Sequence, residues 1–470
     1  MTVREQVLRR ARGYIDDGSF LRQLADLVAY QTESHPPGRK KELERYCAEG
    51  LGPIVSKLGF SVEILPNPLE EHGPVLLATR HEGDGLPTIL IYGHGDVVRA
   101  MPERWRADLD PWKLKVEGDR IYGRGVVDNK GQHLLAIEAL RAILEEKGSL
   151  GFNAKIFVET GEEAGSPGLK AFLERHRERC AADVFIALDG PRQSMQVPDI
   201  TLGTRGGLAV DLIVDLREGS HHSGHWGGLL KDPAVILAHA ISTIISRDGR
   251  ILVPGWTPKS VPESVTRASR AVVIEDAPGA LKPDEGWGEP GLSRTEKIYA
   301  WSSAIVLASV SGQPEAPVPA VSGFAKARIQ LRHTVDVDAA EVAPALKRHL
   351  AEQGFTEVEV RPVVERDMFP PSRTDPDDLW VRRVAESMET TVGRPPNLIP
   401  NIGASGPSEF FKQTLGVPIL WIPQSYGGCG QHGPDEHGLI SLFHDGLGIM
   451  AGVFWDIGAE TTAKSAGNFG

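Results

Sequence analysis

Between about residues 20 and 200, short apolar runs of strand length alternate with longer stretches of helical periodicity. This alternation predicts an α/β domain in which helices cover a largely parallel sheet. In such sheets ligands bind outside the carboxyl ends of the strands, so residues that directly follow strands are the first candidates for a functional site. The expected elements are strands Val75–Ala78, Ile89–Tyr92, Ile156–Glu159 and Val184–Leu188 and helices His133–Glu146 and Leu169–Arg177.

Metal-binding residue types occur at these strand ends and in Gly-rich loops. After three strands come His94, the pair Glu162–Glu163, and Asp189. The Gly-rich loops contribute Asp128, in Gly-Arg-Gly-Val-Val-Asp-Asn-Lys-Gly, and His432, in Gln-His-Gly-Pro-Asp-Glu. Two imidazoles and at least three carboxylates are the ligand inventory of a two-metal hydrolase. The sequence therefore predicts an enzyme.

Asp128 suits the carboxylate that bridges two metal ions, because its flanking glycines permit close backbone approach just before a helix. The alternative is that Asp128 is the N-cap of helix His133–Glu146, since Asp is a favoured cap. Both interpretations stay open on these residues alone.

The adjacent Glu162 and Glu163 leave the backbone in different directions, so one can bind a metal while the other faces a water of lowered pKa. That second carboxylate is placed to act as a general base. In His-Gly-Asp, an extended backbone puts His94 and Asp96 on one face, so Asp96 can accept the second N–H of the imidazole.

The chain has 470 residues, which exceeds the roughly 250–300 at which a single core stops growing, so two domains are expected. After Gly203 the elements follow the order βαββαβ, the ferredoxin-like arrangement. We therefore expect a second domain, residues 203–372, inserted into a first domain formed by residues 1–202 and 373–470. Its elements are strands Leu208–Leu216, Ala304–Val310, Ala325–His333 and Glu357–Arg361 and helices Asp232–Ile245 and Ala339–Gln353.

Two segments lack a predicted element. Residues 253–297 are rich in Pro, Gly and Trp and show no periodicity. A structureless loop of this length indicates function, an interface or a wrong assignment, and the sequence does not choose among them. The last residues, Glu460–Gly470, are expected to be a frayed tail.

Composition excludes several classes of partner and compartment. Lys and Arg number 51 against 63 Asp and Glu, a net charge of −12, and no basic block stands out, which argues against nucleic acid or an anionic membrane as a partner. The three cysteines suggest neither a disulfide framework nor a thiolate zinc site. No signal peptide or membrane span is evident, so we expect a cytoplasmic protein.

With these motifs in this order, the chain resembles the M20 family of co-catalytic metallopeptidases, which includes carnosinases, dipeptidases and aminoacylases. The resemblance implies a zinc-peptidase-like catalytic domain with two divalent ions per subunit. It implies that Asp128 bridges them, that Glu163 and His432 complete one site, and that His94 and Asp189 complete the other. Glu162 becomes the general base and Asp96 the residue that orients His94. Zinc is the expected ion, and these ligands would also suit manganese or cobalt.

The inserted domain resembles the family's lid, which implies a homodimer. The loop Glu218–Gly228 is similar to the lid stretch that carries a substrate-contacting imidazole, here His222, although Ser220-His221 departs from the common Asp-Leu, and His221 or His225 remains an alternative. Three more substrate contacts are implied: Arg332 for a substrate carboxylate, and Ser405 and Gly406 in a Gly-rich loop for the substrate's terminus. That loop reads Ile402-Gly-Ala-Ser where Glu-Gly-Gly-Ser is common.

The expected function is metal-dependent hydrolysis of the amide bond of a dipeptide or related small amide through a metal-bridging hydroxide, with Glu162 as general base. Asp rather than Glu at position 189 favours peptide substrates within the resemblance. The first alternative is an amidohydrolase or deacylase acting on an N-acyl amino acid or another non-peptide amide. The second, a non-catalytic peptide-binding homologue, is disfavoured because every ligand position and Glu162 hold competent residues.

Overall fold

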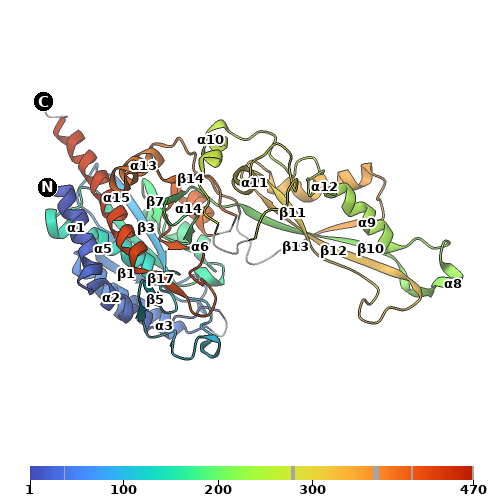
Figure 1. Cartoon of the computed structure of the whole chain (residues 1–470), viewed down its shortest axis with the longest axis horizontal. Helices are drawn as coiled ribbons and strands as arrows, with labels where there is room; N and C mark the ends of the chain where they lie inside the picture. The colour runs from blue at the N-terminus through green and yellow to red at the C-terminus, as the bar shows by residue number, and fades with distance from the viewer. Residues whose placement is uncertain (36–37, 277–280, 364–369, 404–405, 468–470) are drawn as a thin grey trace.

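The computed structural model describes residues 1–35, 38–276, 281–363, 370–403 and 406–467, with side chains up to residue 459. The chain forms a rounded body and a long arm that projects from it (Figure 1). The body is built on an eight-stranded sheet and the arm on a four-stranded sheet. The predicted α/β class with an inserted second domain is confirmed, while the boundaries at residues 202 and 373 stay predictions.

The sheet of the body is mixed. Its strands, in spatial order, are β1 (Ser61–Leu65), β2 (Val75–Arg80), β6 (Asn153–Glu159), β3 (Thr88–His94), β7 (Val184–Ala187), β15 (Ile419–Trp421), β9 (Asp199–Thr201) and β14 (Asn397–Ile399). The central strands β6, β3, β7 and β15 are parallel, but β1–β2, β2–β6 and β15–β9 are antiparallel pairs. Beyond this centre β9–β14 is also a parallel pair, so the prediction of a largely parallel sheet fails only at those three antiparallel pairs, because apolar patterning does not encode strand direction.

Helices cover both faces of this sheet. Along β3, Ile89 and Ile91 join the larger core while Leu90 and Tyr92 join the smaller one, the alternation expected of a strand. The larger core is covered by α1 (Val3–Asp16), α2 (Ser19–Val28), α5 (Lys130–Lys147), α13 (Leu379–Val392) and α15 (Ile440–Gly467), and the smaller one by α6 (Leu169–Arg175), α7 (Arg177–Cys180) and α14 (Ser408–Leu415).

Two predicted element ends are corrected here. Helix α5 begins at Lys130, three residues before the expected start, because buried polar residues at its first turn masked the apolar periodicity. The predicted frayed tail is also wrong over most of its length, since α15 continues to Gly467.

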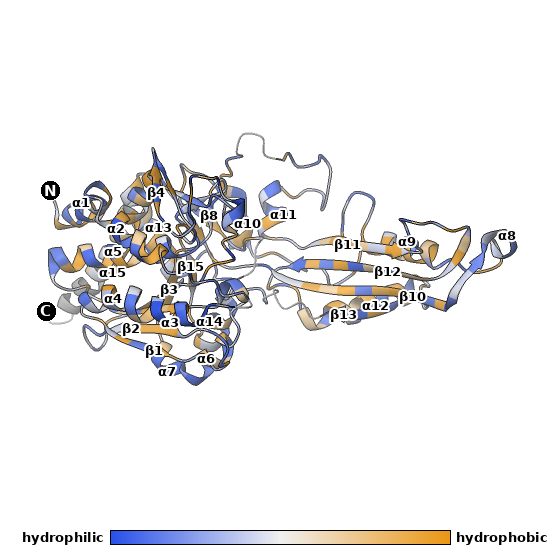
Figure 2. Ribbon diagram, turned by 90° about the horizontal axis from the view of Figure 1, so that it is seen from below, coloured by the Kyte–Doolittle hydropathy of each residue, from blue (hydrophilic) through white to orange (hydrophobic). Residues whose placement is uncertain are grey.

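The arm has the predicted βαββαβ order. Its antiparallel sheet runs β11 (Ser303–Ser311), β12 (Ala320–His333), β10 (Gly206–His222) and β13 (Glu359–Val363), and the helices that pack on it are α9 (Pro233–Ile244) and α12 (Val342–Glu352). Burial alternates along β12, and Figure 2 shows the matching alternation of hydrophobic and hydrophilic residues. The short helix α8 (Ser223–Trp226) lies at the far tip (Figure 1).

The segment 253–297 is not structureless, which corrects the prediction. It contains α10 (Glu263–Ala271), and α11 (Arg294–Tyr299) begins within it. Trp256 is buried in the core of the arm, where its indole Nε1 donates to the Val342 carbonyl at 2.8 Å. Val272 and Tyr299 instead pack against Ile399 of the body. The segment therefore contacts both sheets.

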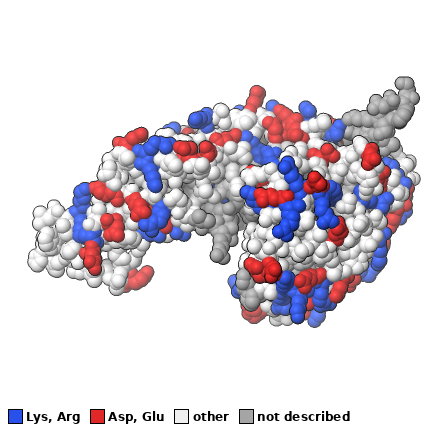
Figure 3. All heavy atoms as spheres, turned by 180° about the vertical axis from the view of Figure 1, so that it is seen from behind, with Lys and Arg blue, Asp and Glu red and all other residues white. Residues whose placement is uncertain are grey.

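The remaining elements lie around the body. They are α3 (Lys40–Arg45), the π-helical turn η1 (Tyr46–Leu51), α4 (Gly52–Lys57), the single turns η2 (Pro102–Arg104), η3 (Glu162–Ala164) and η4 (Ala339–Glu341), and strands β4 (Lys115–Glu117), β5 (Arg120–Tyr122), β8 (Pro191–Arg192), β16 (Ser425–Tyr426) and β17 (His437–Leu439). The face seen in Figure 3 intersperses basic and acidic side chains. Among the described helices, none is long and apolar enough to cross a membrane.

Candidate metal centre

The central parallel strands bring the predicted ligands to one edge of the sheet. In the register of β3 and β6, His94 lies opposite Glu159, and Tyr92 of β3 lies opposite Ala187 of β7. The residues that follow β6 and β7, which include Glu163 and Asp189, therefore emerge beside His94. This is the strand-end arrangement that the sequence predicts.

Asp128 lies between two imidazoles and takes part in two clusters of ligand atoms. On one side, His94 Nε2 is 3.0 Å from Asp128 Oδ1 and 3.5 Å from Asp189 Oδ2. On the other, His432 Nε2 is 2.9 Å from Asp128 Oδ2 and 3.1 Å from Glu163 Oε2. Within each cluster the ligand atoms all lie within 4.8 Å of one another. The structure thus brings together all five predicted ligands.

The donor set fits a divalent cation. Imidazole nitrogens and carboxylate oxygens are the usual ligands of zinc and related ions. In addition, Glu163 Oε1 is buried and, among the described residues, has no hydrogen-bond partner. Buried polar atoms without partners are costly unless something else satisfies them. These residues therefore suit a divalent metal cofactor.

Asp128 is not the cap of α5, so that alternative is wrong. The N-cap position is Asn129, and no side chain caps the helix. Asn129 fixes the loop instead: its Nδ2 donates to the Leu188 carbonyl at 2.7 Å, and its Oδ1 accepts from the His94 N–H at 3.3 Å. Burial opposes ionisation of Asp128, but hydrogen bonds from His432 and His94 outweigh it and lower the pKa of the carboxyl.

Asp96 holds the turn that carries the two glutamates. Its Oδ1 accepts from the Glu162 N–H at 3.2 Å and its Oδ2 accepts from the Glu163 N–H at 3.1 Å. His94 Nδ1 lies 3.1 Å from the main-chain oxygen of Asp96 and 3.5 Å from the carboxylate Oδ1. The main-chain carbonyl makes the shorter contact and the carboxylate lies within ion-pair distance, so the orientation of His94 by Asp96 stays a prediction.

Glu162 stands in a site that resists its ionisation. Burial raises the pKa of its carboxyl well above the ordinary value, and repulsion from Glu163 and Asp189 adds to this effect. Burial likewise raises the pKa of Glu163, to about 8. A carboxylate with a raised pKa is a stronger proton acceptor, the property that general-base chemistry needs near neutral pH.

Glu436 is a structural residue of the centre to which sequence reasoning gave no role. Its buried carboxylate accepts from the N–H groups of Gly125 at 3.0 Å and Val127 at 3.1 Å, and Arg124 Nη1 donates to it at 2.7 Å. Glu436 follows His432 by four residues, so these bonds fix the His432 loop to the Asp128 loop. The only sequence signal was its place in the His432 motif.

We expect Glu436→Gln to lower the free energy of unfolding by about 3–5 kcal/mol, because it leaves the buried Arg124 guanidinium without its counter-charge. Urea unfolding followed by tryptophan fluorescence measures this loss. Glu386→Gln is the matched control, because Glu386 is exposed on α13. A change of less than about 0.5 kcal/mol in Glu436→Gln, the size expected of a surface substitution, would contradict this role.

A cavity of about 350 Å³ opens beside the cluster. Its wall includes Asp128, Glu162, Asp189 and His432, and the predicted substrate contact Gly406 also lines it. Ser405 lies outside the described residues. Arg332 does not line this cavity. It is half-buried near the end of β12, opposite Gly207.

His222 is not brought to the centre within one chain. It ends β10, whose first residue, Gly206, lies at the junction with the body, and a strand of 17 residues spans roughly 55 Å. Figure 1 accordingly shows α8, which follows His222, at the tip of the arm. The imidazole is exposed, and its Nδ1 accepts from the Gly224 N–H at 3.1 Å. The ring of His225 lies beside it, tilted by 33°, with ring centroids 4.8 Å apart.

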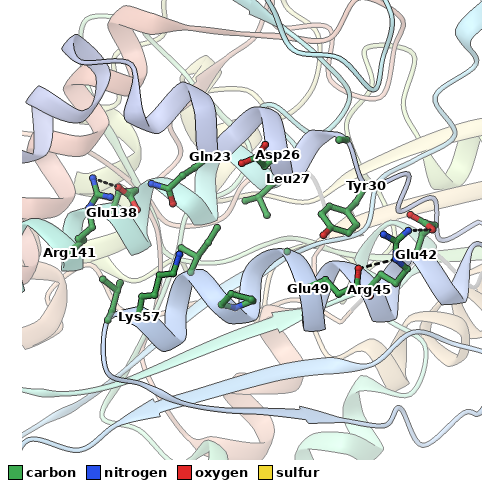
Figure 4. Close-up of a pocket in the computed structure, with 15 residues that line it drawn as sticks. Gln23, Asp26, Leu27, Tyr30, Glu42, Arg45, Glu49, Lys57, Glu138 and Arg141 are labelled. Carbon is green, nitrogen blue, oxygen red and sulfur yellow. Dashed lines mark hydrogen bonds and ion pairs between the residues drawn. The ribbon is translucent and has the colours of Figure 1, made fainter.

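A second cavity, of about 680 Å³, lies between α2, η1, α4 and α5 (Figure 4). Its charged side chains largely pair with one another. Arg45 contacts Glu42 and Glu49, and Arg141 contacts Glu138. Because it contains none of the predicted ligands, it is not a candidate active site.

The fold and the centre together define a metal-dependent hydrolase of two-domain α/β architecture. The chain belongs to peptidase family M20/M25/M40, whose model matches residues 90–456.

Several relatives in this family are dipeptidases. The chain is 26% identical to the cysteinylglycine-S-conjugate dipeptidase of Corynebacterium striatum, over 83% of this chain and 84% of that protein. It is 25% identical to human beta-Ala-His dipeptidase, over 96% and 93% of the two chains. Among solved structures, human carnosine dipeptidase 1 matches with a TM-score of 0.71 at 23% identity, over 98% of this chain and 99% of that chain.

Proposed function

We propose that this protein is a dipeptidase that hydrolyses the amide bond of a dipeptide with the help of two divalent ions per subunit. The observation that carries the proposal is the pair of ligand clusters that share Asp128, with Glu162 lining the same cavity. The family membership and the names of the relatives supply the reaction class.

The proposed ligand sets follow the two clusters. His94 and Asp189 would hold one ion, Glu163 and His432 the other, and Asp128 would contact both. Zinc is the ion we propose first, with manganese and cobalt as the alternatives that these ligands also suit. When bound, such ions polarise a scissile carbonyl and lower the pKa of water.

Glu162 is the proposed general base. It would take the proton of the attacking water and pass it to the leaving nitrogen. Its carboxylate lines the same cavity as the ligands, which is the position that both steps need. Asp96 serves as a positioning residue, since its carboxylate fixes the backbone of the Glu162–Glu163 turn.

We also propose that the chain works as a homodimer through the arm, whose tip would complete a partner's site. The tip is exposed, rich in His and Gly, and far from its own metal centre (Figure 1). His222 would contact the substrate across the dimer, with His221 and His225 as alternatives, while Arg332, Ser405 and Gly406 would bind the substrate's ends. The cytoplasmic location remains a prediction.

A substrate screen tests the function itself. Protein stripped of metal and reloaded with zinc, manganese or cobalt is assayed on a panel of dipeptides and on N-acyl amino acids. We expect kcat/KM on the best dipeptide to exceed that on the best N-acyl amino acid by at least about tenfold. The reverse order would favour the deacylase alternative, and no turnover of either class with any metal would contradict the proposal.

Complementation tests the contact across the dimer. We expect His222→Ala to lower turnover by roughly 10²–10³-fold, the cost of one donor to a developing oxyanion. A His222→Ala subunit mixed with a Glu162→Gln subunit should recover activity, because each heterodimer then assembles one intact site. His225→Ala tests the alternative contact at the same tip and should leave turnover unchanged if His222 is the residue that contacts the substrate. If a mixture shown by mass to contain heterodimers is as inactive as its parents, His222 does not act in trans.

A further inference from the structure

One wall of the active-site cavity is uncharged. Apart from the ligands and Glu162, the described residues that line the cavity carry no ionisable side chain, and the wall includes the apolar residues Pro191, Ile402, Trp421 and Pro423. A charge placed against such a wall loses its hydration without gaining a partner. The wall therefore suits an uncharged part of a substrate.

Four polar side chains interrupt this wall, and two of them are already engaged. Gln431 Nε2 donates to Asp128 Oδ2 at 2.8 Å, and the Thr204 hydroxyl pairs with that of Ser372 at 3.3 Å. The other two are Gln193 and Thr201. Of these two residues, Gln193 has the longer side chain. Its amide carries two N–H donors, whereas the Thr201 hydroxyl carries one O–H donor.

Gln193 is held in place on three sides by other segments. Its main-chain N–H donates to Asp199 Oδ2 at 2.6 Å, and its main-chain carbonyl accepts from the Glu275 N–H at 2.9 Å. Its side-chain Oε1 accepts from the Tyr299 hydroxyl at 2.8 Å. With Oε1 engaged, Nε2 is the free end of the amide, and none of the described residues accepts a hydrogen bond from it.

Two of these contacts, from Glu275 and Tyr299, come from the segment around α10 and α11, for which the sequence suggested no definite role. Tyr299 is buried together with Val272 and Ile399, and Ile402 of the cavity wall packs against them. Glu275 Oε2 also accepts from Ser194 Oγ and the Met195 N–H, each at 3.1 Å. This segment therefore supports the cavity wall from behind.

We propose that Gln193 determines substrate specificity: its Nε2 donates a hydrogen bond to an uncharged acceptor on a substrate side chain, and Tyr299 positions it. The proposal rests on the proposed dipeptidase function and names the substrate class, a dipeptide whose residue at this wall has an uncharged, hydrogen-bond-accepting side chain. Tyr299 acts only through Gln193 and is a positioning residue.

Two dipeptide series, X-Gly and Gly-X with X as Gln, Leu, Lys or Glu, test the proposal with the metal-loaded enzyme. In whichever series places X against the uncharged wall, we expect the substrates with X as Gln or Leu to have a higher kcat/KM than those with X as Lys or Glu. We expect Gln193→Leu to lower the Gln-to-Leu ratio of kcat/KM by roughly 3–10-fold, the net worth of one neutral hydrogen bond, through KM rather than kcat. Tyr299→Phe should lower this ratio in the same direction by a smaller factor.

The controls separate a specificity role from a structural one. Gln196→Leu, an exposed change in the same loop, should leave the ratio unchanged, and metal content should match the wild type in all variants. An unchanged ratio in both Gln193→Leu and Tyr299→Phe overturns the inference, as does a Lys or Glu substrate that ranks first in both series. Those results leave the wild type active, whereas a wild type that hydrolyses no dipeptide overturns the proposed function and this inference together.

Discussion

Asp128→Ala is expected to lose the metal ions of both clusters, so that the metal content falls from about two per chain to near zero. The reason is that Asp128 supplies one oxygen to each cluster, 3.0 Å from His94 Nε2 and 2.9 Å from His432 Nε2. Its removal leaves two ligands in each, fewer than the three protein ligands typical of a catalytic zinc site. Elemental analysis after gel filtration measures the loss.

Asp189→Ala provides the matched comparison for Asp128→Ala. Asp189 belongs to one cluster only, so this variant should retain about one ion per chain. Two tightly held ions in Asp128→Ala would show that the carboxylate is not shared, and the assignment of the centre would then be wrong.

Glu162→Gln should keep both ions and lose turnover by roughly 10²–10⁴-fold, the usual contribution of a general base. The amide preserves the shape of the side chain but cannot take a proton from water. Steady-state kinetics on the best dipeptide, combined with elemental analysis, measure both quantities.

Glu163→Gln separates the two adjacent glutamates. Because Glu163 Oε2 lies 3.1 Å from His432 Nε2 within a ligand cluster, this variant should lose metal affinity as well as activity. Turnover like that of the wild type in Glu162→Gln would rule Glu162 out as the base.

The ligand cluster was predictable from the sequence because strand ends in a parallel sheet meet at one edge. His94 ends β3, Glu163 and Asp189 come shortly after β6 and β7, and these three strands are adjacent and parallel in the structure. The position after a strand was therefore sufficient to bring these residues together. The order of the arm's elements was predictable for a similar reason, since its strands and helices carry distinct periodicities.

Other features depend on backbone groups and long-range contacts that leave no local pattern. The Glu436 carboxylate accepts hydrogen bonds from main-chain N–H groups of the Asp128 loop. Nearly every residue type has such a donor, so the sequence gives no sign of these bonds. The bond from Tyr299 to Gln193 joins residues 106 positions apart, and neither residue belongs to a motif. The sequence also did not predict the strand direction at the edges of the sheet, because apolar spacing does not specify direction. It did not predict the short helices α10 and α11 either.

A metal titration of the stripped protein tests whether two ions held at the shared Asp128 centre are required for dipeptide hydrolysis. Hydrolysis of the best dipeptide is followed while zinc, manganese or cobalt is added to a chelator-treated sample of known concentration. We expect negligible turnover without metal, a rise as ions are added, and a plateau at about two equivalents per chain. The requirement for two ions would be contradicted if dipeptide hydrolysis survived complete removal of metal, or if turnover did not change as ions were added.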